Sequence, residues 1–140
     1  MFAQRRKGIA VLGLFLFVSS GSPAQDRPQL DGRWAQRDGC EKDAEGKLQG
    51  MSRAEASNYS LIEIKGNSIE WQYSLASCEI SQIKGGPRRY LARANCEYRS
   101  REYANDIEIS FVGKDQMTMS FSNKDFPFAQ TTSYRRCSSK

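Results

Sequence analysis

The sequence Leu30-Asp31-Gly32-Arg33-Trp34 decides how the rest of the chain can fold. Leu30, Gly32 and Trp34 alternate with polar residues, as they would along one face of a short β-strand. The segment Tyr134-Arg135-Arg136-Cys137, near the other end of the chain, is also typical of a strand. If these two segments pair, the first and last strands are neighbours and the sheet between them closes into a barrel.

Between these two segments, apolar residues recur at every second position, and Gly, Asn and Asp interrupt them at strand-length intervals. The pattern predicts about eight strands, with turns at Gly66-Asn67, at 85–88 and at 113–115. A change of parity near Ala76-Ser77 predicts a β-bulge or a bend there. We therefore expect an all-β domain that forms a single antiparallel up-and-down barrel, or a barrel-like meander, with its last strand over 128–136.

Three segments do not follow this alternation. Residues 41–50 are charged and contain glycine, and residues 100–106 are polar, so we expect both to be loops. Ser52-Arg53-Ala54-Glu55 fits a capping box, which predicts a helical turn over 52–57. The inward-facing side chains expected after the first hairpin are Ile69, Trp71, Tyr73 and Leu75.

Residues 1–24 have the three parts of a secretory signal peptide. Residues 5–7 are basic, residues 9–18 form an apolar run too short to cross a bilayer, and small residues at 22 and 24 fit a cleavage site. We expect the mature chain to be a single disulfide-bonded domain over 25–140. It would have no membrane span and would be periplasmic or secreted.

Cleavage also changes the charge of the protein. It removes three of the 21 basic residues and no acidic residue, so the net charge falls from +5 to +2. A charge this small is typical of an ordinary solvated surface, and it argues against nucleic-acid binding.

Four cysteines follow the cleavage site, and an even number in an exported chain favours two disulfides. A turn at 85–88 places Cys78 and Cys96 opposite each other in one hairpin. Cys40 and Cys137 then remain to pair with each other, which requires that the first and last strands be neighbours. The arrangement Cys40–Cys78 with Cys96–Cys137 remains open, as does the third arrangement.

At Gly32-Arg33-Trp34 the chain resembles the lipocalin and wider calycin barrels. In those families a Gly-x-Trp begins the first strand, and an arginine near the end of the chain packs across the indole. Arg136 fits that arginine, and Arg135 is the alternative. The resemblance implies structural roles for Gly32, Trp34 and Arg136, and it implies that the barrel carries a small apolar ligand.

The residues needed for common catalytic chemistry are missing from the sequence. The chain contains no histidine, which is the commonest general base and metal ligand. The cysteines are expected to be oxidised, and most glutamates alternate with inward apolar residues and should face solvent. We therefore predict no enzyme, with no catalytic residue, no metal site and no cofactor.

Two binding hypotheses follow, and a structural envelope protein without a ligand is the third. A small apolar ligand inside the barrel would contact the bulky inward residues Trp71, Tyr73, Tyr90, Tyr98, Phe111 and Phe121. Alternatively, the protein is a binding or inhibitory module whose partner is an envelope or secreted protein. Its loop Phe126, Pro127 and Phe128 would then supply apolar anchors, although Phe126 could equally close the barrel as a lid. In either case we expect a monomer.

Overall fold

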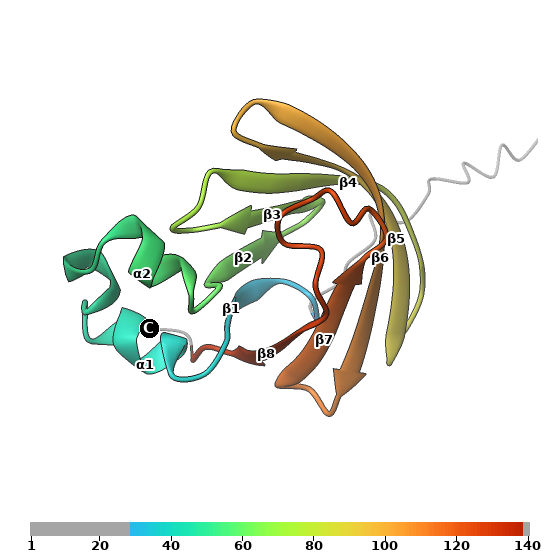
Figure 1. Cartoon of the computed structure of the whole chain (residues 1–140). Helices are drawn as coiled ribbons and strands as arrows, with labels where there is room; N and C mark the ends of the chain where they lie inside the picture. The colour runs from blue at the N-terminus through green and yellow to red at the C-terminus, as the bar shows by residue number, and fades with distance from the viewer. Residues whose placement is uncertain (1–28, 139–140) are drawn as a thin grey trace, which may run out of the picture.

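The computed structural model describes residues 29–138, so the predicted signal peptide lies outside the described residues. Eight antiparallel strands follow one another around a closed barrel in chain order (Figure 1). The all-β, up-and-down architecture predicted from the alternation is confirmed. The strands are β1 (Gly32–Ala35), β2 (Ile62–Lys65), β3 (Ser68–Trp71), β4 (Ala76–Gly85), β5 (Arg89–Tyr98), β6 (Arg101–Val112), β7 (Gln116–Phe121) and β8 (Thr132–Arg136).

The seam of the barrel is the pairing of β1 with β8. Trp34 lies opposite Arg136 and Ala35 opposite Arg135. One further hydrogen bond runs from the Cys137 N–H to the Arg33 carbonyl, at 2.8 Å. The first and last strands are therefore neighbours, as the two terminal segments of the sequence predicted.

The predicted hairpin at Gly66-Asn67 is confirmed, because Lys65 pairs with Ser68 on either side of it. Of the bulge or bend predicted near Ala76-Ser77, the bend is confirmed, because β3 ends at Trp71 and the chain turns over 72–75 before β4 begins. The two rows of apolar residues therefore belong to different strands. The register shift in β4 lies further along, between Ile80 and Gln82.

The segment between β1 and β2 is helical. It contains α1 (Gly39–Ala44), the 3₁₀ helix η1 (Leu48–Gly50) and α2 (Arg53–Ser57), so the prediction of a loop over 41–50 is wrong. The capping box is confirmed. The Glu55 N–H donates to the Ser52 hydroxyl at 3.2 Å, and the Ser52 N–H donates to the Glu55 carboxylate at 3.1 Å.

Two strand boundaries also differ from the prediction. Residues 101–106 belong to β6 and are not a loop, and the last strand begins at Thr132 and not at 128. The start of β6 is polar because its inward positions include Asn105, which is only 3% exposed. Its side chain accepts a hydrogen bond from the Asn123 N–H at 3.0 Å, so a buried amide takes the place of an apolar residue.

The molecule has two hydrophobic clusters. The larger one fills the barrel. The smaller one lies between the helical segment and the outer side of the wall near β1, and it is built on Ala35, Leu48, Ala56 and Leu61. Tyr73 packs against this second cluster, and Leu75 is 59% exposed. The prediction that these two residues point into the barrel is therefore wrong, because β3 ends before them.

Both favoured disulfides are present. Cys78 and Cys96 are directly opposite on β4 and β5, with Cα atoms 4.0 Å apart. Cys40 and Cys137 have Cα atoms 5.1 Å apart and join α1 to the chain just after β8. The two alternative arrangements are excluded, since all four cysteines are used in these bridges.

Candidate functional site

One end of the barrel is closed around Trp34. Its ring is buried, and its indole N–H donates to the Leu30 carbonyl at 2.9 Å. The Arg136 guanidinium lies over the ring at 4.2 Å from the centroid. It donates to the carbonyls of Asp31, at 2.7 Å, and of Gln29. Arg136 therefore fastens the segment before β1 to the end of β8.

Gly32 makes room for this contact. Its φ of +137° lies in a region that side chains disfavour, and a Cβ added there would be 3.0 Å from Nη1 of Arg136. Gly32, Trp34 and Arg136 thus form one structural unit. The predicted arginine is Arg136, while the side chain of Arg135 points elsewhere and forms an ion pair with Glu41.

Aromatic rings fill much of the barrel at the opposite end. The Trp71 ring lies 5.9 Å from Phe121, 5.8 Å from Phe126 and 5.2 Å from Phe128, measured between centroids. Edge-to-face and tilted contacts at these distances are favourable in themselves. The rings therefore serve one another as packing partners.

The six predicted ligand-contacting residues are not brought together. Trp71 and Phe121 belong to the ring cluster just described, and Tyr98 borders it through Phe128, at 5.7 Å. Phe111 lies at the other end, in contact with Trp34 at 6.0 Å and with Tyr90 at 6.0 Å. Tyr73 lies outside the barrel interior.

The loop after β7 folds over the barrel. Phe126 is only 1% exposed and contacts Phe121 and Tyr103 at centroid distances of 5.3 and 5.5 Å. It therefore has the position of the lid and is not available as a surface anchor. Phe128 is partly buried against the same cluster, and Pro127 alone of the three predicted residues is exposed.

One polar feature lies inside the barrel. Among the described residues, the indole nitrogen of Trp71 is the buried side-chain polar atom without a hydrogen bond. Burial raises the pKa of the nearby Tyr134 hydroxyl far above its ordinary value, and the side chains of Thr132 and Trp71 oppose this only in part. Tyr134 therefore keeps its proton at physiological pH and cannot act there as a base.

An open groove of about 1360 Å³ crosses β4, β5, β6 and β7. Along each strand, the exposed lining residues alternate with buried residues that face the barrel core. Because the exposed side chains point outward, the groove lies on the outer side of the sheet. The Gly66-Asn67 hairpin borders one side, and Lys124 and Thr131 border the other. The lining residues on the four strands are Ile80 to Lys84, Leu91 to Arg93, Asp106 to Glu108 and Ser120 to Ser122.

The charges in this groove are unevenly paired. Asp106 faces Arg93, with 3.6 Å between the carboxylate and the guanidinium, and Glu108 faces Arg89 at 3.1 Å. Lys84 and Lys124 line the same groove, and neither has a carboxylate within ion-pair distance among residues 29–138. Lys124 Nζ donates instead to the Phe121 carbonyl at 3.3 Å. The unbalanced charge of the groove is therefore positive.

This groove could not be predicted from the sequence. Its residues follow ordinary strand alternation, so no motif marks them. The Gly66-Asn67 hairpin borders the groove partway along β4 because β4 is much longer than β3 (Figure 1), and strand lengths at that junction were not predicted.

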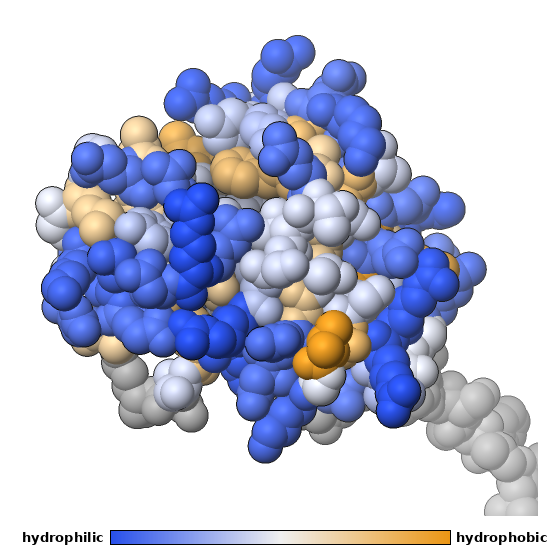
Figure 2. All heavy atoms as spheres, turned by 60° about the horizontal axis from the view of Figure 1, so that its bottom comes forward, coloured by the Kyte–Doolittle hydropathy of each residue, from blue (hydrophilic) through white to orange (hydrophobic). Residues whose placement is uncertain are grey.

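Exposed apolar area elsewhere is scattered. Figure 2 shows one face on which hydrophilic residues predominate and hydrophobic residues form small spots. The large apolar side chains exposed in the described part of the chain are Leu75, Leu91 and Val112, from three different segments. Only Leu91 lines the large groove.

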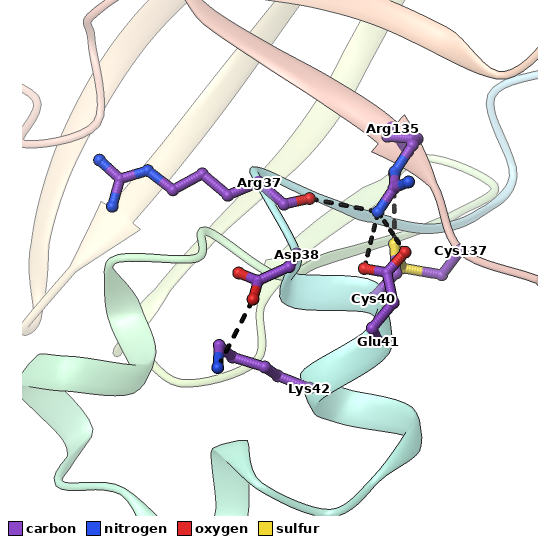
Figure 3. A network of polar contacts seen from close by, with 7 residues as sticks. All are labelled: Arg37, Asp38, Cys40, Glu41, Lys42, Arg135 and Cys137. Carbon is purple, nitrogen blue, oxygen red and sulfur yellow. Dashed lines mark hydrogen bonds and ion pairs between the residues drawn. A yellow bond between two sulfur atoms is a disulfide. The ribbon is translucent and has the colours of Figure 1, made fainter.

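A second polar cluster lies beside the seam disulfide (Figure 3). The Arg135 guanidinium donates to both carboxylate oxygens of Glu41, at 2.5 and 2.7 Å, and to the Arg37 carbonyl at 3.3 Å. Lys42 and Asp38 form a separate pair at 3.5 Å. The Arg135 contacts hold α1 against the end of β8, beside the disulfide. An open pocket of about 280 Å³ adjoins them and is lined by Arg37, Arg135 and residues of β7 and β8.

Residues 29–138 contain no group of three or more His, Cys, Asp or Glu side chains that could hold a metal ion. None of the helices within that range is long and apolar enough to cross a membrane. Comparison with protein-family models, with curated proteins and with solved structures gives no match for this chain.

Proposed function

We propose that this protein is a binding module of an oxidising compartment, either the periplasm or the extracellular medium, and that it holds a protein partner on the outer side of its barrel. The observation that carries the proposal is the groove across β4 to β7. It combines two lysines that form no ion pair within residues 29–138 with backbone groups and small polar side chains. A surface of this size and composition suits a segment of a protein better than a small apolar compound.

Two disulfides support the choice of compartment, because disulfides persist where the environment is oxidising. The secretory signal predicted over 1–24 agrees with it. We also propose that the barrel is of the calycin type, on the strength of the Gly32, Trp34 and Arg136 unit at its closed end.

The filled interior weighs against a carrier of small apolar ligands. A carrier of that kind needs an apolar cavity with a mouth, and here Trp71, Phe121 and Phe126 pack against one another. Binding without catalysis fits the placement of the groove carboxylates Asp106 and Glu108, which are each paired with an arginine on the barrel surface.

The test is affinity capture with the immobilised mature chain from periplasmic and culture-medium extracts, with mass spectrometry of both proteins and small molecules. We expect one protein to be retained in stoichiometric amount and to be displaced by free mature chain. If the retained protein is a hydrolase, its activity is then measured with and without the chain. Recovery of an apolar compound without a protein would contradict the proposal in favour of a carrier.

A further inference from the structure

Within residues 29–138, one edge of β4 has no partner strand over half its length. β3 pairs with β4 only up to Glu79, which lies opposite Ser68. The next bond on that side runs from the Ile80 N–H to the Asn67 carbonyl at 2.7 Å, and no backbone bond between described residues follows it there. Beyond it, β4 continues to Gly85 and pairs with β5 alone.

The backbone groups on this edge point outward from the ladder. In an antiparallel pair, alternate residues bond to the neighbouring strand and the residues between them bond to the other side. The Gly86 N–H donates to the Arg89 carbonyl at 2.7 Å, and Lys84 opposite Leu91 continues the same register. The N–H and C=O groups of Ile83 and Gly85 therefore face the unpaired edge.

The comparable overhang on β6 is covered. Residues 101–106 extend beyond β7, but the loop after β7 supplies substitutes for a strand. The Ser122 N–H donates to the Asp106 carbonyl at 2.9 Å, and the Asn123 side chain donates to the Ala104 carbonyl at 3.2 Å. Exposed strand edges are usually protected in this way, whereas within residues 29–138 nothing protects the edge of β4 after Ile80.

The open edge of β4 borders the positively charged groove described above. Residues Ile80 to Lys84 belong both to the edge strand and to the groove lining. Ile83 is partly buried and packs against the barrel core, while Lys84 is exposed. A strand added here would therefore place one side chain towards an apolar neighbour and the next towards a cation.

We propose that the edge of β4 binds an extended acidic segment of the partner protein by strand addition. Backbone hydrogen bonds to Ile83 and Gly85 supply the affinity common to all such segments. An apolar residue opposite Ile83 and an acidic residue facing Lys84 supply the selectivity. This inference rests on the proposed function and specifies the chemistry of the partner.

The first test uses a dye-labelled synthetic peptide of ten residues in which valine alternates with glutamate, with fluorescence anisotropy as the measurement. Two control peptides have lysine or serine in place of glutamate. We expect the acidic peptide to bind at least tenfold more tightly than either control. The affinity should fall as salt is raised, because salt screens attraction between exposed charges.

Variants locate the binding on the protein. Lys84→Glu should weaken binding of the acidic peptide at least tenfold, whereas Lys124→Glu, on the far side of the groove, should weaken it less than threefold. Arg53→Glu makes the same charge change on α2, where no ion pair within residues 29–138 involves Arg53, and should alter the affinity less than twofold. Ile83→Pro removes the N–H that would bond to an added strand and should abolish binding of all three peptides. Its melting temperature shows whether the variant is folded. If it is not, the lysine variants alone test whether the peptide binds at this edge.

Several outcomes would overturn the inference. These are equal binding of the three peptides, an unchanged affinity in Lys84→Glu, equally tight binding of single-stranded DNA, or a dimer of the chain itself that Ile83→Pro abolishes. If a captured protein still binds Lys84→Glu, the proposed function stands and strand addition is wrong. If the acidic peptide binds as expected but no protein is captured, the proposed function fails and the chemistry of the edge stands.

Discussion

The seam between β1 and β8 and the hairpin of β4 and β5 each have a disulfide, yet they are held in different ways. The hairpin ladder runs over the whole length of both strands. At the seam only Trp34 and Ala35 pair with β8, one further backbone bond joins Cys137 to Arg33, and side chains supply the remaining links. These are the Arg136 contacts over Trp34, the Glu41–Arg135 pair and the Cys40–Cys137 bridge. A closed barrel thus concentrates its cross-links where its backbone ladder is shortest.

The largest expected difference concerns the two disulfides. The seam bridge spans 97 residues and the hairpin bridge 18, so the chain-entropy model gives about 4–5 kcal/mol for the first and about 3 kcal/mol for the second. Cys78→Ala/Cys96→Ala retains only the seam bridge, and Cys40→Ala/Cys137→Ala retains only the hairpin bridge. Urea unfolding of each variant with and without reductant isolates the bridge that remains. Equal losses on reduction would show that the seam does not depend more on its bridge.

A smaller effect is expected from Arg136→Met. The substitution removes hydrogen bonds to the backbone carbonyls of Gln29, Asp31 and Lys114, the ion pair with Asp115 and the cation–π contact with Trp34, which should lower the free energy of unfolding by about 2–3 kcal/mol. The matched control is Arg135→Met, which loses a surface ion pair and should cost at most about 1 kcal/mol. A larger loss at Arg135 would mean that the ion pair, and not the cation over Trp34, secures the seam.

Gly32→Ala should cost about 1–2 kcal/mol, because φ at this position is positive and the added methyl group meets Arg136. Gly50→Ala is the control, since a Cβ there has open space, and it should change stability by less than about 0.5 kcal/mol. In Arg136→Met the obstructing guanidinium is gone, so Gly32→Ala should cost less in that background. Strict additivity would contradict a direct clash.

The smallest effect is expected from Glu41→Gln. The carboxylate and its partner Arg135 are both about half exposed, so losing the pair should cost about 0.5 kcal/mol or less. The cost should decrease further as salt is raised. A loss comparable with that of Arg136→Met would show that α1 is anchored by charge as much as by the disulfide.

The barrel and its seam could be predicted because both depend on local patterns. Alternation specified the strands, Gly66-Asn67 the first hairpin, and Gly32-x-Trp34 with Arg136 the closed end. The pairing of Cys40 with Cys137 then followed from closure. The short helix α1 could not be predicted in this way, because its six residues contain no apolar stripe and its position is set by Cys137 and Arg135, which are distant in the sequence.

Sequence patterns of this kind could not predict most of the candidate site. The free edge of β4 depends on where β3 ends, and the turn over 72–75 contains Tyr73 and Leu75, which continue the alternation of a strand. The protection of β6 depends on Asn105 and Asn123, whose amides resemble loop residues until their partners are known. Phe126 was recognised as an apolar loop residue, but its burial follows from contacts with three strands.

The Arg136 guanidinium touches the carbonyl of Gln29, so the two ends of the described chain meet beside β1. A short linker there, with new termini opened between Arg99 and Ser100, would give a circular permutant with the same cyclic order of strands. In that permutant Cys40 would follow Cys137 closely along the chain. The same sulfur–sulfur bond would then close a loop of roughly 20 residues in the unfolded polypeptide, and its entropic contribution would fall from about 4–5 to about 3 kcal/mol.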